Sequence, residues 1–167
     1  MRQEGPRAYG RPTMTFRYST EDVYHLGIVV PDIDRGMEEI GRRFNVTFPP
    51  HLPIEVDLTV GRREFHLSTR FVYSREGPPY IELFQGVPDS PFALPRDGSG
   101  IHHLGIFVDD MAAEVARLKA LGTELELHDI GIDGQPRGVA FFNSLGVRQE
   151  LVSSESRTGL KWLTTRS

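Results

Sequence analysis

The sequence predicts an α+β fold in which two tandem βαβββ modules form one half-open, barrel-like sheet with helices on the outside. Three observations support this prediction. The tetrapeptide His-Leu-Gly-Ile occurs at residues 25–28 and again at residues 103–106, 78 positions later. A helix-type pattern follows each copy, and each half then ends on a strand-type segment that contains Glu-Leu, at residues 82–83 and 150–151. A repeat of this kind indicates duplicated units that share a core.

Each module begins with a strand and a short helix. The runs VYHLGIVV (residues 23–30) and IHHLGIFV (residues 101–108) are mostly apolar and rich in β-branched residues, as strands are. Acidic residues follow each run, Asp32 in the first copy and Asp109 or Asp110 in the second, where a helix N-cap is expected. Apolar residues then recur at the spacing of one helix face, over residues 34–44 and 111–121, and Gly122 marks the expected end of the second helix.

Three further strands complete each module. We expect them at residues 54–60, 64–74 and 80–87 in the first module and at residues 123–131, 138–144 and 147–154 in the second. The first module has 57 positions between its His and its Glu, against 47 in the second, and we expect the extra residues to lengthen a hairpin near Gly61. The predicted organisation is a flexible tail at 1–20, a single domain at 21–155 made of modules 21–90 and 100–155, and a C-terminal tail at 156–167.

Composition limits the classes of function. The 167 residues suffice for one domain, and no apolar run approaches the roughly 20 residues of a membrane-spanning helix. The first residues lack the apolar centre of a signal peptide, and the absence of cysteine excludes disulfides and thiolate metal sites, which fits a cytoplasmic protein. A net charge of −4 argues against a nucleic-acid partner, because neutralising phosphates requires a basic face. We therefore expect a small-molecule substrate, with neither a nucleic-acid nor a membrane partner.

Strand alternation brings four polar side chains to one face. His25 and His103 alternate with the apolar residues that we expect to pack against the helices, so both imidazoles face the concave side of the sheet. The same alternation turns Glu82 and Glu150 inward, and a pseudo-twofold relation between the modules would bring the four together. Two imidazoles and two carboxylates suit a divalent transition metal and leave one or two positions open for substrate. The sequence predicts one ion of zinc, nickel, cobalt, manganese or iron per chain at these four residues.

A substrate pocket is expected beside this centre. Phe84 and Phe107 share the inward face with the four proposed ligands, so both are candidates for its wall. His66 and Tyr73, in the expected strand at 64–74, are two further candidates.

With these residues, the chain resembles the vicinal oxygen chelate superfamily of glyoxalase, bleomycin-resistance and dioxygenase proteins. The resemblance covers about residues 22–153 and is closest to methylmalonyl-CoA epimerases and similar glyoxalase-like proteins, above all over residues 80–111 with their DSP and GIHH elements. It implies that the first strand of each module supplies a His ligand and the last strand a Glu ligand, on the same four positions, and that the protein forms a homodimer.

The sequence also departs from the epimerases. They usually carry Gln at the position of Glu82, where glyoxalase I has Glu, and the glyoxalase-type DPDG turn is replaced here by NSLG at residues 143–146. Residues 46–72 do not match the epimerase pattern, so Glu55 is only a candidate counterpart of its catalytic Glu.

Three functions are compatible with this site. The first is a metal-dependent isomerase, epimerase or lyase, in which Glu82 or Glu150 transfers a proton next to a carbonyl while the metal stabilises the enolate. It is favoured because four protein ligands leave two adjacent positions, enough for a chelating substrate.

The alternatives use the same cavity differently. An extradiol-type Fe(II) dioxygenase acting on a catechol would need only His25, His103 and Glu150 as ligands, but Glu82 would then occupy one of the three positions that catecholate and dioxygen require. A non-enzymatic binding or resistance protein would instead sequester a small molecule between the aromatic residues.

Overall fold

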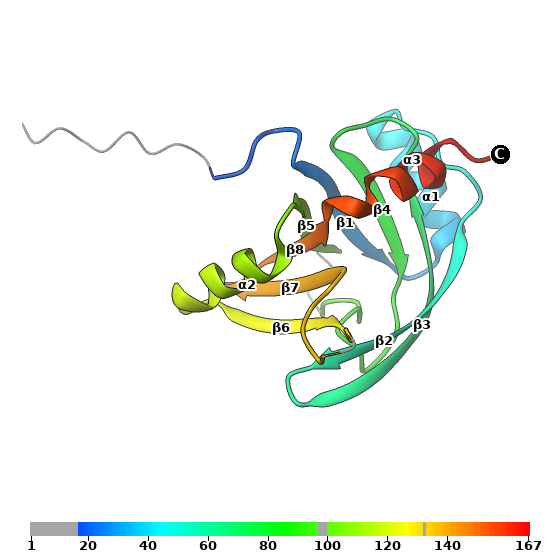
Figure 1. Cartoon of the computed structure of the whole chain (residues 1–167). Helices are drawn as coiled ribbons and strands as arrows, with labels where there is room; N and C mark the ends of the chain where they lie inside the picture. Colours follow the sequence, from blue (N-terminus) through cyan, green and yellow to red (C-terminus); the bar gives the residue numbers. More distant parts are fainter. Residues whose placement is uncertain (1–16, 97–99, 132) are drawn as a thin grey trace, which may run out of the picture.

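The computed structural model describes residues 17–96, 100–131 and 133–167, so most of the expected N-terminal tail lies outside the described residues. Eight strands form one closed barrel in the order β1-β4-β3-β2-β6-β7-β8-β5. Along the chain the elements of Figure 1 are β1 (Val23–Val30), α1 (Ile33–Phe44), β2 (Leu52–Val60), β3 (Arg63–Tyr73), β4 (Tyr80–Gln85), β5 (Ile101–Val108), α2 (Met111–Ala120), β6 (Glu124–Asp129), β7 (Val139–Ser144), β8 (Val147–Ser153), η1 (Ser154–Ser156) and α3 (Arg157–Thr165).

The two βαβββ modules have the same internal pairing. The first strand of each module lies parallel to its last strand, β1 beside β4 and β5 beside β8, and the other pairs within a module are antiparallel. An antiparallel pair of β1 and β5 joins the modules on one side. The α+β fold class and the duplicated modules are therefore confirmed.

The sheet closes further than the half-open barrel that the sequence predicted. The long β2–β3 hairpin, which turns at Gly61 and Arg62, brings β2 against β6, where residues 58–60 pair with residues 127–129. The additional residues of the first module thus supply the strand length that reaches the second module. Because a closed sheet has no edge on either side, the barrel interior is enclosed by strands all round.

The first two helices lie outside the barrel, on opposite sides of the molecule (Figure 1). Asp32 caps α1 by accepting a hydrogen bond from the backbone N–H of Arg35 at 2.9 Å, and Asp110 caps α2 in the same way from Ala113 at 2.9 Å. Apolar residues on the outer face of β1, including Ile28 and Val30, pack against α1. The residues of opposite parity in the same strand are left to face the interior.

The segment expected from the sequence to be a C-terminal tail forms η1 and α3. Leu160 and Leu163 of α3 pack on a buried aromatic cluster that includes Tyr24 and Phe107. Arg75 connects the end of this helix to the barrel, because it donates hydrogen bonds to the carbonyl oxygens of Thr164, at 3.3 Å, and of Arg166, at 2.8 Å. The helix, red in Figure 1, therefore covers one opening of the barrel.

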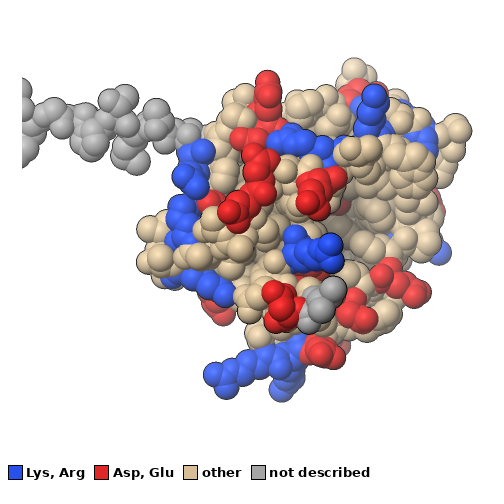
Figure 2. Space-filling model, in the orientation of Figure 1, with Lys and Arg blue, Asp and Glu red and all other residues tan. Residues whose placement is uncertain are grey.

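The surface shown in Figure 2 carries acidic and basic side chains interspersed around a hollow, without a continuous basic patch on this face. None of the helices in the described parts of the chain combines the length and the apolar character needed to cross a membrane.

The N-cap of α2 can be tested by substitution. We expect Asp110→Ala to lower the free energy of unfolding by about 1 kcal/mol, because the first turn of the helix loses the acceptor for one of its free N–H groups. Urea denaturation would measure the change. The neighbouring exposed Asp109, which caps nothing, is the matched control, and Asp109→Ala should stay within about 0.5 kcal/mol of the wild type. Equal effects of the two substitutions would contradict the assignment of the cap.

Candidate metal centre

Two imidazoles and two carboxylates meet inside the barrel where the modules join. His25 lies on β1, Glu82 on β4, His103 on β5 and Glu150 on β8. The Nε2 atoms of the two histidines are 2.7 Å apart, and each lies 3.1 Å from Oε2 of Glu82. Oε2 of Glu150 is 3.0 Å from Nε2 of His25 and 3.3 Å from Nε2 of His103. One potential ligand atom from each residue therefore lies within 4.8 Å of all the others.

The pairing of β1 with β5 explains why a glycine lies two positions after each histidine. In this register His25 stands opposite Gly105, and Gly27 stands opposite His103. A Cβ atom on Gly27 would lie 2.1 Å from Cε1 of His103, and one on Gly105 would lie 1.9 Å from Cε1 of His25. No real contact is so short, so each module supplies the space for the imidazole of the other. The repeated His-x-Gly spacing is the signal in the sequence that corresponds to this contact.

The carboxylates reach the cluster through the neighbouring parallel pairs. Glu82 is the register partner of Gly27 across β1 and β4, and Glu150 is the partner of Gly105 across β5 and β8. Each glycine thus has a His on one flanking strand and a Glu on the other. The inward orientation that strand alternation predicted for the four side chains agrees with this arrangement.

The cluster is almost inaccessible to solvent, and its charges compensate one another. Burial by itself lowers the pKa of His25, but the carboxylates of Glu82 and Glu150 outweigh this effect and raise the pKa to about 9. The pKa of His103 is raised as well, because Glu150 and Glu82 together outweigh its burial. Burial raises the pKa of both carboxyls, yet the facing imidazoles more than reverse it and leave the pKa of each Glu below its usual value. Without a metal, the imidazoles therefore favour the ionised form of the carboxylates, and the carboxylates favour the protonated form of the imidazoles.

These donors fit a divalent transition metal. Two ligand atoms that bind one ion at about 2.1 Å and at right angles lie about 3.0 Å apart, close to the nitrogen–oxygen distances of 3.0–3.3 Å seen here. Oε2 of Glu150 is buried and makes no well-aligned hydrogen bond to the two imidazoles that face it, so an ion bound between these groups would satisfy it. Imidazole with carboxylate is a donor set that zinc, nickel, cobalt, manganese and iron accept.

A cavity of about 420 Å³ adjoins the cluster. Glu82 and Glu150 line it, whereas His25 and His103 lie behind them and do not. Its aromatic wall includes three of the residues that the sequence singled out, Phe84, Phe107 and Tyr73, together with Tyr24 and Phe71. Helix α3 contributes the other side through Gly159, Leu160 and Leu163. The carboxylates therefore stand between the imidazoles and a largely apolar space with aromatic residues in its wall.

Two residues that the sequence made candidates do not line this cavity. His66 lies on the outer face of β3, is exposed, and contacts Asp57 with 2.8 Å between its Nδ1 and the carboxylate Oδ1. It is seven positions from Tyr73 on the same strand, and an odd separation puts two side chains on opposite faces. Glu55 is exposed on β2, whereas its neighbour Ile54 lines the cavity, so the prediction of a catalytic role for Glu55 finds no support.

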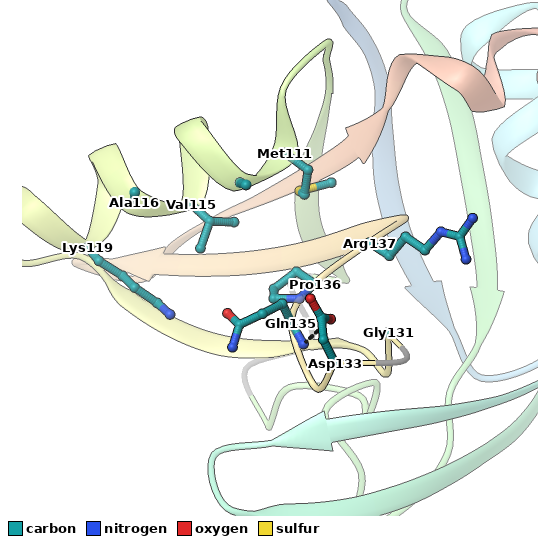
Figure 3. A pocket seen from close by; sticks show the side chains of 10 residues that line it. Met111, Val115, Ala116, Lys119, Gly131, Asp133, Gln135, Pro136 and Arg137 are labelled. Carbon is teal, nitrogen blue, oxygen red and sulfur yellow. Dashed lines mark hydrogen bonds between the residues drawn. The ribbon is translucent and has the colours of Figure 1, made fainter.

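A larger cavity of about 640 Å³ lies outside the barrel, between α2 and the loop from β6 to β7 (Figure 3). Met111 and Val115 form its apolar floor, while Lys119 and Arg137 stand at opposite ends of the group of residues drawn in Figure 3. It contains none of the four residues of the cluster.

Comparison with known proteins is consistent with this architecture. The family model of the Glyoxalase/Bleomycin resistance protein/Dioxygenase superfamily matches residues 24–141. Methylmalonyl-CoA epimerase from Mycobacterium tuberculosis superposes with a TM-score of 0.54 at 19% identity, covering 89% of this chain and 97% of that one.

A Streptomyces coelicolor methylmalonyl-CoA epimerase variant in complex with 2-nitronate-propionyl-CoA gives a TM-score of 0.53 at 20% identity, over 80% and 96% of the two chains. At these identities the likeness to solved structures shows a shared fold. A curated relative, endonuclease V of Thermus thermophilus, is 30% identical over 105 residues, and the match spans 52% of this chain and 46% of that protein. The chain thus spans about half the length of this curated relative.

The glycines opposite the histidines provide a test of the cluster. We expect Gly27→Ala to lower the affinity for Zn²⁺ at least tenfold, because the new methyl group must displace the ring of His103. The same crowding should cost about 1–3 kcal/mol of unfolding free energy. Competition with a chromophoric chelator measures the affinity. As the control, Gly159→Ala adds a Cβ that meets nothing within 4 Å, and it should leave Zn²⁺ binding unchanged.

Metal binding should also release protons. Because the raised pKa of His25, about 9, keeps its imidazole protonated at pH 7 in the metal-free protein, an ion can bind Nε2 only after that proton leaves. The apparent affinity for Zn²⁺ should therefore rise between pH 6 and pH 9 and level off above that range. Calorimetry at pH 7 in buffers of different ionisation enthalpy counts the protons. Binding without proton release would contradict the charge state derived for the cluster.

Proposed function

Since the chain belongs to the glyoxalase, bleomycin resistance protein and dioxygenase superfamily, we propose that it is a metal-dependent isomerase, epimerase or lyase that transfers a proton next to a carbonyl group of a small molecule. In this proposal His25, Glu82, His103 and Glu150 hold one divalent ion. The observation that carries it is the position of the two carboxylates, which line a cavity with aromatic residues in its wall while the two imidazoles lie behind them. An ion held by these donors would polarise the substrate carbonyl and offset the negative charge that develops on its oxygen.

Glu150 is the better candidate for the base. Its side chain is 9% exposed, against 3% for Glu82, so it opens more widely to the cavity. Nε2 of His103 makes a hydrogen-bond contact with Oε2 of Glu82 at 3.1 Å, whereas Oε2 of Glu150 makes no well-aligned hydrogen bond to the two imidazoles, which lie 3.0 and 3.3 Å away. In the proposed reaction the carboxylate of Glu150 takes a proton from the carbon next to the carbonyl, which breaks the C–H bond, and the proton then returns to carbon in the product. Glu82 serves mainly to hold the ion.

The walls of the cavity support this transfer. Tyr24, Phe84 and Phe107 present aromatic faces beside the two carboxylates, so a substrate that fills the cavity would displace water from the reacting groups. Burial raises the pKa of Tyr73 well above its usual range, and the nearby charge of Glu82 adds to this effect. The Tyr73 hydroxyl therefore keeps its proton and can donate a hydrogen bond to the carboxylate of Glu82.

The structure bears on the two alternative functions. A dioxygenase would need three open positions at the metal, yet Oε2 of Glu82 lies as close to both imidazoles as Oε2 of Glu150 does. His66, a candidate for the pocket wall that could have supplied a further acid or base, is exposed on the outer face of the barrel. A purely sequestering protein would use the cavity but would have no need to place two ionised carboxylates in its wall.

Proton exchange tests the proposal directly. Protein loaded with Zn²⁺, Ni²⁺, Co²⁺ or Mn²⁺ would be incubated in D₂O with acids, thioesters and hemithioacetals that carry a hydrogen next to the carbonyl. We expect NMR to show deuterium entering that position for at least one substrate class. Glu150→Gln should slow exchange by at least about 100-fold, since an amide cannot accept the proton.

The matched control is Glu124→Gln, a substitution at an exposed position of β6, which should exchange at the wild-type rate. Oxygen consumption by the iron-loaded protein with a catechol would support the dioxygenase instead. Tight binding of a small molecule without exchange in any metal form would indicate sequestration.

A further inference from the structure

His102 directly precedes the proposed ligand His103, and its ring contacts the side of that imidazole that faces away from the cluster. The two Nδ1 atoms are 2.8 Å apart, and the rings meet edge to face at 86°. His102 is itself buried, and its ring stacks on Phe92 with 4.6 Å between ring centroids. Its other nitrogen, Nε2, lies 2.8 Å from the carbonyl oxygen of Pro91. The ring is therefore held by stacking and at both nitrogens.

The chain of contacts determines where the hydrogens lie. A ligand imidazole must present a lone pair at Nε2, so His103 has to carry its hydrogen on Nδ1. A neutral imidazole has one N–H, so the Nδ1 of His102 must then accept, and the hydrogen of His102 must be on Nε2. That nitrogen faces the carbonyl of Pro91, which can only accept. Each group in the chain from Pro91 to the cluster is thus satisfied when His103 is ready to bind metal.

A contact with Arg148 competes with this arrangement of the hydrogens on His102 and His103. Nη1 of Arg148 also contacts Nε2 of His102, and a guanidinium can only donate. If it governed the ring, the hydrogen of His102 would move to Nδ1 and that of His103 to Nε2, where it would block the metal. Arg148 is, however, paired with Glu126, to which its Nε donates at 2.7 Å and its Nη2 also donates. The ion pair fixes the guanidinium, and Nη1 also lies 3.4 Å from the carbonyl oxygen of Pro91, to which it can donate in place of His102.

We propose that His102 is a positioning residue that sets the tautomer of His103 and thereby tunes the affinity of the centre for its metal. The inference rests on the proposed metal site. Ligand histidines generally donate their second N–H to a carbonyl, a carboxylate or water, and loss of that partner typically costs 10- to 100-fold in metal affinity. Here the partner is a second imidazole, whose own orientation depends on Pro91 and on the Arg148–Glu126 pair.

Two substitutions separate hydrogen bonding from packing. His102→Phe keeps an aromatic ring against Phe92 but removes the acceptor, and we expect the affinity for Zn²⁺ to fall about 10- to 100-fold. His102→Gln loses the stacking but offers a carbonyl to Nδ1 of His103 and an amide N–H to Pro91, so its affinity should stay within about threefold of the wild type. Chelator competition gives the affinities, and thermal unfolding of the metal-free variants shows whether folding is affected.

Long-range ¹H–¹⁵N correlation spectra of the Zn²⁺-loaded wild type provide a second readout, which does not depend on whether a variant folds. The expected spectrum has the hydrogen of His103 on Nδ1 and that of His102 on Nε2. Equal affinities of wild type and His102→Phe, or a hydrogen on Nδ1 of His102 in the loaded protein, would overturn the role of His102 while leaving the metal centre in place. A wild type that binds no divalent ion would overturn both proposals.

Discussion

The antiparallel pairing of β1 with β5 is the contact on which the rest of the site depends. It sets the His-x-Gly segments of the two modules against each other, so that each histidine ring lies over the glycine of the other module. The two Nε2 atoms can approach to 2.7 Å only because neither glycine has a side chain. A shift of one residue in either strand would turn the histidine of that strand toward the helices and leave an apolar side chain in its place. Residues of both modules are therefore required to form the site.

Closure of the barrel shields this arrangement from water. The pairing of β2 with β6 completes the wall, and α3 covers one opening, so the four charged groups are removed from water. Burying a charge is costly unless a partner compensates it, and here two imidazoles face two carboxylates within hydrogen-bonding distance. A divalent cation at these donors would compensate the two carboxylates in place of the protons that the imidazoles hold without it. The same compensation accounts for the raised pKa of His25 and the lowered pKa of Glu150.

Much of this could be predicted from the sequence, because periodicity and repetition are local properties. The repeat identified the modules, and strand alternation alone predicted the inward orientation of His25, His103, Glu82 and Glu150. Features that depend on the pairing of distant strands were out of reach: the close approach at Gly27 and Gly105 requires the register of strands 78 positions apart. Closure of the barrel depends in the same way on how far the β2–β3 hairpin extends. His66 was misplaced for a different reason, since its odd separation from Tyr73 was available in the sequence and excluded a shared face.

The second carboxylate also bears on which reaction such a centre favours. With both Glu82 and Glu150 ionised, a bound divalent cation leaves the centre uncharged, whereas glutamine at the first position, usual in the epimerases that the chain resembles, would leave one positive charge. An uncharged centre holds its ion more firmly but attracts an anionic substrate less strongly. Orientation of the substrate must then come largely from the aromatic wall formed by Tyr24, Phe84 and Phe107, which selects by shape and apolar surface. In the proposed reaction, this combination would suit a substrate that enters without a charge next to the reacting carbon and becomes negative only as its proton leaves. A bound ion and preorganised donors would then stabilise the transition state more than the ground state.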